Sequence, residues 1–234
     1  MQALTTILIV VIAAGALLWL GTWSRRDDRG YLATQLRYQP LSLIVALVAL
    51  LAGWLLVPSG PKVLAVGDMS APTSGLGWLG VGEGDSWASV GLTFLVIMTI
   101  VTAIVVWFQV GRGCTAAAIL KALPVAVALS IVNAFVEEAI FRVVLAHGLA
   151  NFWSATAIAI TSAIVFGLPH WFGTPARVAG VLLAGFMGWF LMLSVLQTGG
   201  IGWAWSIHVV QDVVIIALLI ARDRPARLQV QSLA

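Results

Sequence analysis

Long uncharged apolar segments alternate along this chain with short segments that contain most of its charged residues. A stretch of about 20 apolar residues is the length that a helix needs to cross the hydrocarbon core of a bilayer. The pattern therefore predicts an all-α fold, a polytopic transmembrane helix bundle with about seven to eight spans. The clearest apolar segments cover residues 3–23, 41–58, 88–110, 153–169, 178–197 and 203–221.

The region between residues 113 and 148 decides between seven and eight spans, because it forms either one helix or two. We place Pro124 in the first turn of a helix here, where the missing N–H of proline is tolerated. His147 and Gly148 mark the end of that helix, since glycine often follows the last helical turn. His147 is then a basic side chain near C-terminal carbonyl groups rather than a catalytic residue.

The composition agrees with a membrane protein. The chain is 61% hydrophobic and 9% charged, whereas about 25% of the residues in soluble domains are charged. The single cysteine, Cys114, excludes an internal disulfide and a cysteine-based metal site, and we expect it to pack between helices. Gly180, Ala184 and Gly188 recur every four residues, which predicts a close contact with a neighbouring helix.

The positions of the basic residues predict the orientation, because Lys and Arg concentrate in cytoplasmic loops. Residues 24–40 form the most basic loop, which places the N-terminus outside and the C-terminus in the cytoplasm. Because these side chains lie at the ends of spans, they do not indicate nucleic-acid binding. They are Arg25, Arg26, Arg29, Arg37, Arg112, Lys121, Arg177, Arg222, Arg224 and Arg227.

Residues 59–87 are rich in Gly, Ser and Pro, and most of their charged side chains are acidic. This composition predicts a loop on the outside. We expect Trp78 and Trp87 to anchor it at the membrane surface, where tryptophan is enriched.

Three charged side chains interrupt an otherwise apolar stretch: Glu137, Glu138 and Arg142. A charge at the centre of a span costs roughly 2.5–3.5 kcal/mol on insertion scales, so such residues are rare and often functional. Glu138 and Arg142 are four residues apart with the acid first, the favourable order for an ion pair on a helix. Glu137 points about 100° away, on the face of Asn133 and Phe141.

Two interpretations of this acidic pair remain open. In the first, Glu138 and Arg142 form a scaffold while Glu137, unpaired within its own helix, serves as a general base. In the second, both glutamates only pair with Arg142 and hold helices together.

Two histidines on other spans favour the first interpretation. Phe166 and His170 share a face at the end of one span, and His208 and Asp212 lie one turn apart on the last span. A carboxylate at residue 212 could fix the tautomer of His208 or bind a substrate.

These three motifs resemble those of the CAAX protease and bacteriocin-processing (CPBP, or Abi) intramembrane proteases, which include the type II CAAX prenyl endopeptidases. The motifs are Glu137-Glu138-x-x-x-Arg142, Phe166-x-x-x-His170 and His208-x-x-x-Asp212. In this family the last position is often Asn, and here it is Asp. The resemblance covers residues 120–221 and implies a multi-pass protein of a bacterial cell membrane.

The resemblance also implies a domain organisation and a mechanism. Residues 1–111 would be variable N-terminal spans, 112–221 a catalytic helix bundle and 222–234 a short basic cytoplasmic tail. Glu137 and His170 would activate a water molecule for attack on a peptide bond of a membrane-associated protein or peptide. The pair His208 and Asp212 would stabilise the oxyanion, a contribution commonly worth about 2.7–4 kcal/mol, with support from Glu138, Arg142 and Phe166.

Other interpretations remain open. We expect no cofactor, but a zinc ion held by Glu137, His170 and His208 is the chemical alternative. A proton-coupled transporter would also use ionisable residues inside the membrane, and a non-catalytic immunity protein would keep the motifs as structure. One geometric difficulty stands: at 1.5 Å per residue, straight helices place the three side chains at depths of roughly 20, 27 and 12 Å. Pro169 and helix tilt would have to bring them together.

Overall fold

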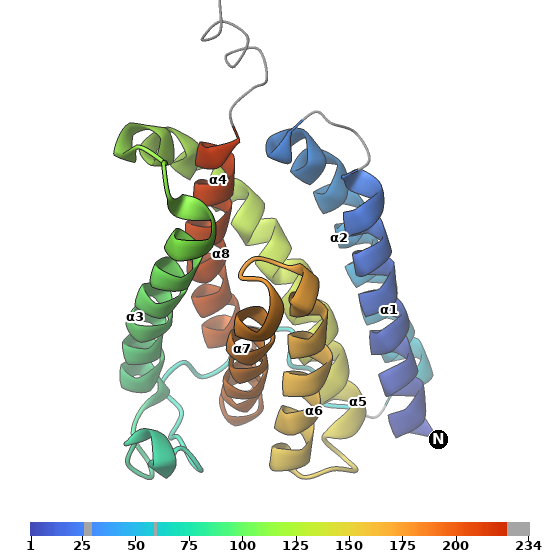
Figure 1. Ribbon diagram of the computed structural model, residues 1–234. Coiled ribbons are helices and arrows are strands. Elements are labelled where there is room, and N and C mark those ends of the chain that lie inside the picture. Colours follow the sequence, from blue (N-terminus) through green and yellow to red (C-terminus); the bar gives the residue numbers. More distant parts are fainter. Residues whose placement is uncertain (26–29, 59, 224–234) are drawn as a thin grey trace, which may run out of the picture.

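The computed structural model describes residues 1–25, 30–58 and 60–223, which form a bundle of helices (Figure 1). Seven helical segments are long and apolar enough to cross a membrane, and the described residues contain no strand beyond an isolated bridge. This confirms the predicted all-α, polytopic fold. The segments are α1 (Gln2–Ser24), α2 (Tyr31–Leu56), α3 with η2 (Trp87–Gly111), α4 with η3 and α5 (Ala116–Leu149), α6 with η4 (Ala155–Phe172), α7 (Arg177–Thr198) and α8 (Gly202–Arg222).

The helices pack as three main pairs. The most extensive contacts join α4 to α8, α6 to α7 and α1 to α2, while α3 packs on the outer side of α8. In Figure 1, α1 and α2 (blue) lie on one side of the bundle, α8 (red) lies in the centre and α3 (green) covers the other side. The helices α4, η3 and α5 run behind and connect the two sides.

The region 113–148 forms one continuous helical path rather than two spans. It comprises α4 (Ala116–Glu138), a π-helical segment η3 (Ala139–Val144) and α5 (Leu145–Leu149). At 34 residues it is longer than one vertical span requires. A long span accommodates its length by tilting, and α4 crosses the bundle obliquely in Figure 1.

Two helix starts differ from the sequence-based expectation. Pro124 lies in the interior of α4, and Pro40, predicted to end a loop, lies inside α2, which begins at Tyr31. Both prolines are exposed at the outside of the bundle, so their rings do not clash with a neighbouring helix. Membrane helices tolerate such internal prolines.

The start of α2 is held by the end of α8. The backbone N–H of Tyr31 donates a hydrogen bond to the carboxylate of Asp223. A carboxylate at a helix N-terminus satisfies a free N–H group and interacts favourably with the helix dipole. This contact explains why α2 starts ten residues before the apolar segment at 41–58.

Small residues bring α6 and α7 into backbone contact, as their spacing predicted. A Cβ atom at Gly188 would lie 2.8 Å from the carbonyl oxygen of Ser162, and one at Gly167 would lie 2.9 Å from the Cα atom of Gly185. Neither helix could approach this closely with larger side chains. The contact positions the end of α6, which carries Phe166, and the following turn η4 (Leu168–Phe172), which carries His170.

The loop between α2 and α3 corrects one prediction and supports another. Trp87 is fully buried and its Nε1 donates to Gln197 at 2.9 Å, so it is not a membrane-surface anchor, whereas Trp78 is 69% exposed. The ring nitrogens of His147 lie 2.7 and 3.0 Å from the carbonyl oxygens of Val57 and Pro61. His147 therefore contacts carbonyl groups of the segment that follows α2 rather than those of its own helix.

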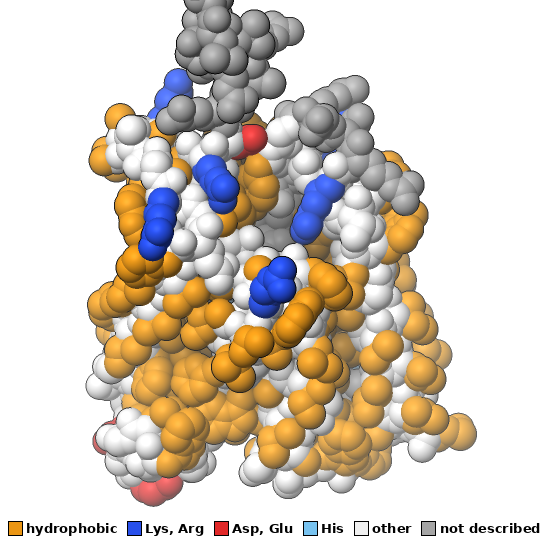
Figure 2. Space-filling model, in the orientation of Figure 1, with side chains coloured by type: hydrophobic (Ala, Val, Ile, Leu, Met, Phe, Trp, Pro, Cys, Tyr) orange, Lys and Arg blue, Asp and Glu red, His pale blue; other side chains and the backbone are white. Residues whose placement is uncertain are grey.

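Charged residues separate towards the two ends of the bundle. Arg25, Arg112, Lys121 and Arg222 lie near the same end, because they flank the ends of α1, α3 and α8 and the start of α4. Figure 2 shows the Lys and Arg side chains over the upper half of the view, with one acidic side chain among them, and further acidic side chains at the lower left. The residues Arg26, Arg29, Arg224 and Arg227, and with them most of the tail 222–234, lie outside the described residues.

Candidate active site

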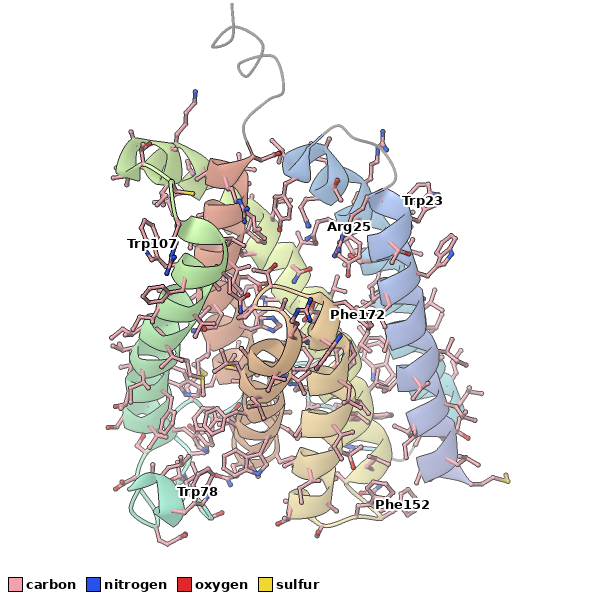
Figure 3. The ribbon with its side chains drawn as sticks, in the orientation of Figure 1. Trp23, Arg25, Trp78, Trp107, Phe152 and Phe172 are labelled. Carbon is pink, nitrogen blue, oxygen red and sulfur yellow. The ribbon has the colours of Figure 1, made fainter. Side chains whose placement is uncertain are left out.

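A cavity of about 940 Å³ opens between the α1–α2 pair and the helices α4, α7 and α8. All four predicted catalytic side chains line it, and they come from three different spans: Glu137, His170, His208 and Asp212. Arg25 and Phe172, labelled in Figure 3, also line this cavity.

Glu138 and Arg142 are fully buried and do not line the cavity. The Nε atom of Arg142 lies 3.2 Å from Oε2 of Glu138, which is the predicted ion pair. The guanidinium carbon lies 4.0 Å from the centre of the Phe166 ring, and the terminal nitrogens of Arg142 have no hydrogen-bond partner among the described residues. The ring face stabilises the buried cation in place of water.

The π-helical segment η3 follows Glu138 directly. A π-turn adds one residue to the helical turn and leaves backbone groups without their usual partners, and such turns are frequent at functional sites. Here the Oγ of Ser162 on α6 donates to the carbonyl oxygen of Phe141 at 3.3 Å. This bond ties α6 to the helix that carries the two glutamates.

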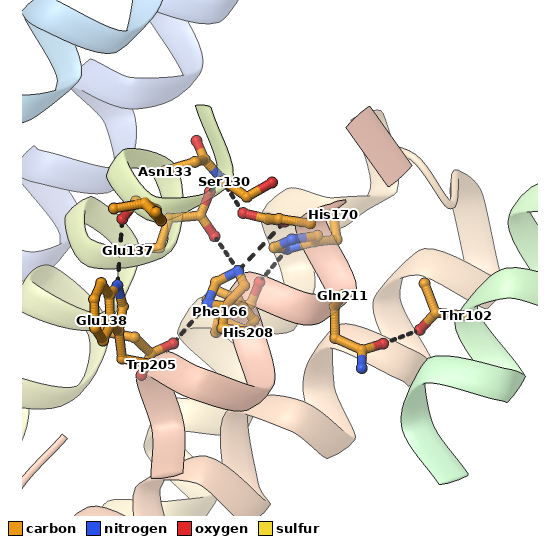
Figure 4. A network of polar contacts seen from close by, with 12 residues as sticks. Thr102, Ser130, Asn133, Glu137, Glu138, Phe166, His170, Trp205, His208 and Gln211 are labelled. Atoms are coloured by element: carbon orange, nitrogen blue, oxygen red, sulfur yellow. Dashed lines mark hydrogen bonds and ion pairs between the residues drawn. The ribbon is translucent and has the colours of Figure 1, made fainter. Parts of the chain in front are cut away.

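His208 is surrounded by three carboxylates (Figure 4). Its Nδ1 lies 2.7 Å from Oε1 of Glu138, while its Nε2 lies 3.6 Å from Oε2 of Glu137 and 3.7 Å from Oδ1 of Asp212. Because a carboxylate accepts at Nδ1, that nitrogen carries a proton and Nε2 faces the cavity. Glu138 therefore fixes the tautomer, a role that the sequence spacing had suggested for Asp212.

His170 is oriented by the backbone of its own span. Its Nδ1 lies 2.7 Å from the carbonyl oxygen of Phe166, so Nδ1 is the donor and Nε2 keeps its lone pair. At this point α6 passes into the 3-10 turn η4 (Leu168–Phe172). In a 3-10 turn this carbonyl would accept from residue 169, but Pro169 has no N–H, which leaves room for the imidazole.

The ring of Phe166 lies between the two histidines and contacts both. Its ring centre lies 4.7 Å from that of His170 and 5.7 Å from that of His208. Both imidazoles thus pack on one buried aromatic ring, although His170 forms no ion pair with a carboxylate among the described residues. Despite the predicted difference in depth, all three side chains line one cavity, at which α4 runs obliquely and α6 ends in the turn at Pro169.

An amide on α4 connects the two carboxylates that face the cavity. The Nδ2 of Asn133 donates to Oε1 of Glu137 at 3.2 Å and to Oδ2 of Asp212 at 3.0 Å. Gln39 of α2 in turn donates to Oδ1 of Asn133 at 3.3 Å. The sequence placed Asn133 on the face of Glu137 but gave it no function, and nothing in the spacing pointed to Gln39.

The zinc alternative needs donor atoms that converge on one point. No group of three His, Cys, Asp or Glu side chains among the described residues is arranged to hold a metal ion. The side chains proposed as ligands, Glu137, His170 and His208, line the same cavity without forming such a group. We therefore derive no chemical step through a metal.

Comparison with known families identifies the same part of the chain. Residues 119–214 match the family described as type II CAAX prenyl endopeptidase Rce1-like, which confirms the resemblance seen in the three motifs. All seven motif residues lie within the matched segment, which spans less than half of the chain. No curated protein and no solved structure matches the chain. The matched segment is similar to a family of CAAX prenyl endopeptidases, and the seven apolar helices indicate an integral membrane protein.

Proposed function

We propose that this protein is a glutamate-dependent intramembrane endopeptidase that cleaves a membrane-associated protein or peptide within the cavity between α2, α4 and α8. The observation that carries the proposal is the arrangement of Glu137, Asp212 and His208 at the wall of one cavity. The family description favours a substrate with a lipid-modified C-terminal segment.

Glu137 is the general base. Asn133 holds its Oε1, while Oε2 is buried at the cavity wall, lies 3.6 Å from Nε2 of His208 and has no hydrogen-bond partner among the described residues. The side chain is only 16% exposed, so little bulk water competes for this oxygen. A water molecule that donates a hydrogen bond to Glu137 would lose that proton to Oε2 as the water oxygen attacks the carbonyl carbon of the peptide bond.

His170 is the second acceptor for that water. Its Nδ1–H is held by the carbonyl oxygen of Phe166, so the lone pair of Nε2 is available. A water that donates one hydrogen to Glu137 and the other to His170 has its own lone pair directed to the substrate. Positioning of this kind lowers the barrier by removing orientational freedom before the reaction.

His208 and Asp212 stabilise the negative charge that develops on the carbonyl oxygen. A doubly protonated His208 donates from Nδ1 to Glu138 and directs Nε2–H, which lies between Glu137 and Asp212, to the oxyanion. Asp212, as a carboxylate, acts by holding His208 rather than by donating. When the oxyanion collapses, the C–N bond breaks and the proton taken by Glu137 passes to the leaving amine.

The distribution of charge supports an orientation with the C-terminus in the cytoplasm. The end of the bundle that carries Arg25, Arg112 and Arg222 faces inwards by the positive-inside rule. Arg25 and Tyr31 line the cavity at that end. A cytoplasmic peptide therefore reaches the site from the basic end of the bundle.

The test is a comparison of cells that produce the wild-type protein with cells that produce Glu137→Gln. Mass spectrometry of membrane peptides should show cleavage products that depend on Glu137, while thermal unfolding of the purified variant stays close to wild type. Glu83→Gln, in the exposed outer loop, is the matched control and should cleave normally. If the cleavage products were the same with Glu137→Gln as with wild type, the proposed protease function would be wrong. If Glu137→Gln instead abolished a pH-dependent ion flux, the protein would be a transporter.

A further inference from the structure

Asn133 uses both hydrogens of its side-chain amide on carboxylates of the site. One is donated to Oε1 of Glu137 at 3.2 Å and the other to Oδ2 of Asp212 at 3.0 Å. These two carboxylates come from α4 and α8, helices that meet at the cavity wall. One planar amide thereby fixes the position of an acid on each helix.

The direction of this amide is determined from α2. The Nε2 atom of Gln39 donates to Oδ1 of Asn133 at 3.3 Å and to Oε1 of Gln35 at 3.1 Å. Because Oδ1 receives a donor, the nitrogen of Asn133 must face the carboxylates. Gln39 is only 5% exposed, so water does not readily replace it as the donor.

We propose that Gln39 and Asn133 form a positioning relay for the catalytic carboxylates, and that the second span therefore completes the active site. This inference rests on the proposed protease function. Gln39 lies outside the segment 119–214 that matches the family. It acts through Asn133 and touches neither the attacking water nor the peptide.

The relay determines which oxygens face His208. With Oε1 of Glu137 and Oδ2 of Asp212 bound to the amide, their other oxygens lie at nearly equal distances, 3.6 and 3.7 Å, from Nε2 of His208. Loss of the amide would let the two carboxylates rotate, and one could then approach Nε2 of His208 closely enough to accept a hydrogen bond. That hydrogen bond would occupy the donor that the oxyanion needs.

A double-mutant cycle tests whether Gln39 acts through Asn133. Asn133→Ala should lower kcat by about ten- to hundredfold, the range for a lost hydrogen bond to a charged group. Gln39→Met, which keeps the side-chain length, should lower kcat several-fold, and KM should stay near wild type in both variants. The double variant should match Asn133→Ala, because residues that act in one network are not additive.

Ser130→Ala is the matched control for this cycle. Ser130 is buried one turn before Asn133, and among the described residues its hydroxyl donates to the carbonyl oxygen of Ala126 in its own helix. Its removal should leave kcat and KM unchanged. A Gln39→Met variant with wild-type kcat, or effects that simply multiply in the double variant, would overturn the relay while Glu137 remained essential.

A second measurement is independent of proteolysis. The chain contains three histidines, so selective 15N labelling gives a small set of imidazole signals. Gln39→Met should shift the signals of His208 more than those of His147 and His170. His208 lies 3.6 and 3.7 Å from the two carboxylates held by Asn133, whereas the other two histidines form no ion pair with them among the described residues. Unchanged His208 signals would reject the relay even if the protein proved not to be a protease.

Discussion

Glu138 on α4 accepts a hydrogen bond from Nδ1 of His208 on α8 at 2.7 Å, and both side chains are buried. The other carboxylate oxygen of Glu138 lies 3.2 Å from Nε of Arg142. One glutamate thus balances a buried cation and also fixes the imidazole that faces the cavity. The structural and the positioning roles of this residue can be separated by experiment.

Glu138→Gln should reduce both stability and activity, for different reasons. The amide leaves the buried Arg142 without its counter-charge, and breaking a buried ion pair typically costs about 3–5 kcal/mol. Combining Glu138→Gln with Arg142→Met should restore most of the free energy of unfolding, because no uncompensated charge remains, while cleavage stays low. Thermal unfolding in detergent and cleavage rates would be measured in parallel. Recovery of cleavage in the double variant would show that Glu138 serves only as scaffold.

Phe166→Leu tests the aromatic ring on which the two imidazoles pack. The variant removes the ring face over Arg142 and the contacts to His170 and His208. We expect a loss of roughly 1–3 kcal/mol in stability and a fall in kcat larger than any change in KM, since the histidines lose their orientation. Phe152→Leu is the control, because Phe152 is 54% exposed and lies in the turn before α6, away from the site at the other end of this helix. Equal effects of both substitutions would show a general loss of packing.

Gly188→Ala tests the contact that places α6. The added methyl group would lie 2.8 Å from the carbonyl oxygen of Ser162 and 2.9 Å from the Cα atom of Ala163, so backbone must move. Overpacking of this kind costs typically about 1–3 kcal/mol, and it should also displace His170 and lower cleavage. Gly15→Ala has open space around the added atom and should leave unfolding temperature and cleavage unchanged or slightly raise stability. A stable, fully active Gly188→Ala variant would contradict the importance of this contact.

The spans could be predicted because apolar length is a strong signal, but their ends could not. Pro40 and Pro124 look like helix starts in sequence, yet both lie inside helices with their rings on the outer surface. The start of α2 depends on Asp223, which is 192 residues away along the chain. No local pattern contains that contact.

The spacing of residues in the sequence predicted a contact in the site only where both partners lie on the same helix. The pair Glu138 and Arg142 is one helical turn apart and forms as predicted. The bond from His208 to Glu138 joins two helices, and the spacing therefore pointed to Asp212 instead. Gln39 carries no charge and belongs to no motif, so only the packing of α2 against α4 shows its contact with Asn133.

Removal of metal ions provides the last prediction. The described residues contain no group of three side chains arranged to hold a metal ion, and we expect cleavage by the purified protein to persist in excess chelator. Metal content measured on the same sample should be far below one ion per chain. The imidazole Nε2 atoms of His170 and His208 both face the cavity, so a zinc site would have to use them together with Glu137. Activity that is lost on chelation and restored by zinc, with bound zinc lost in His170→Ala, would replace the metal-free mechanism with a zinc-dependent one.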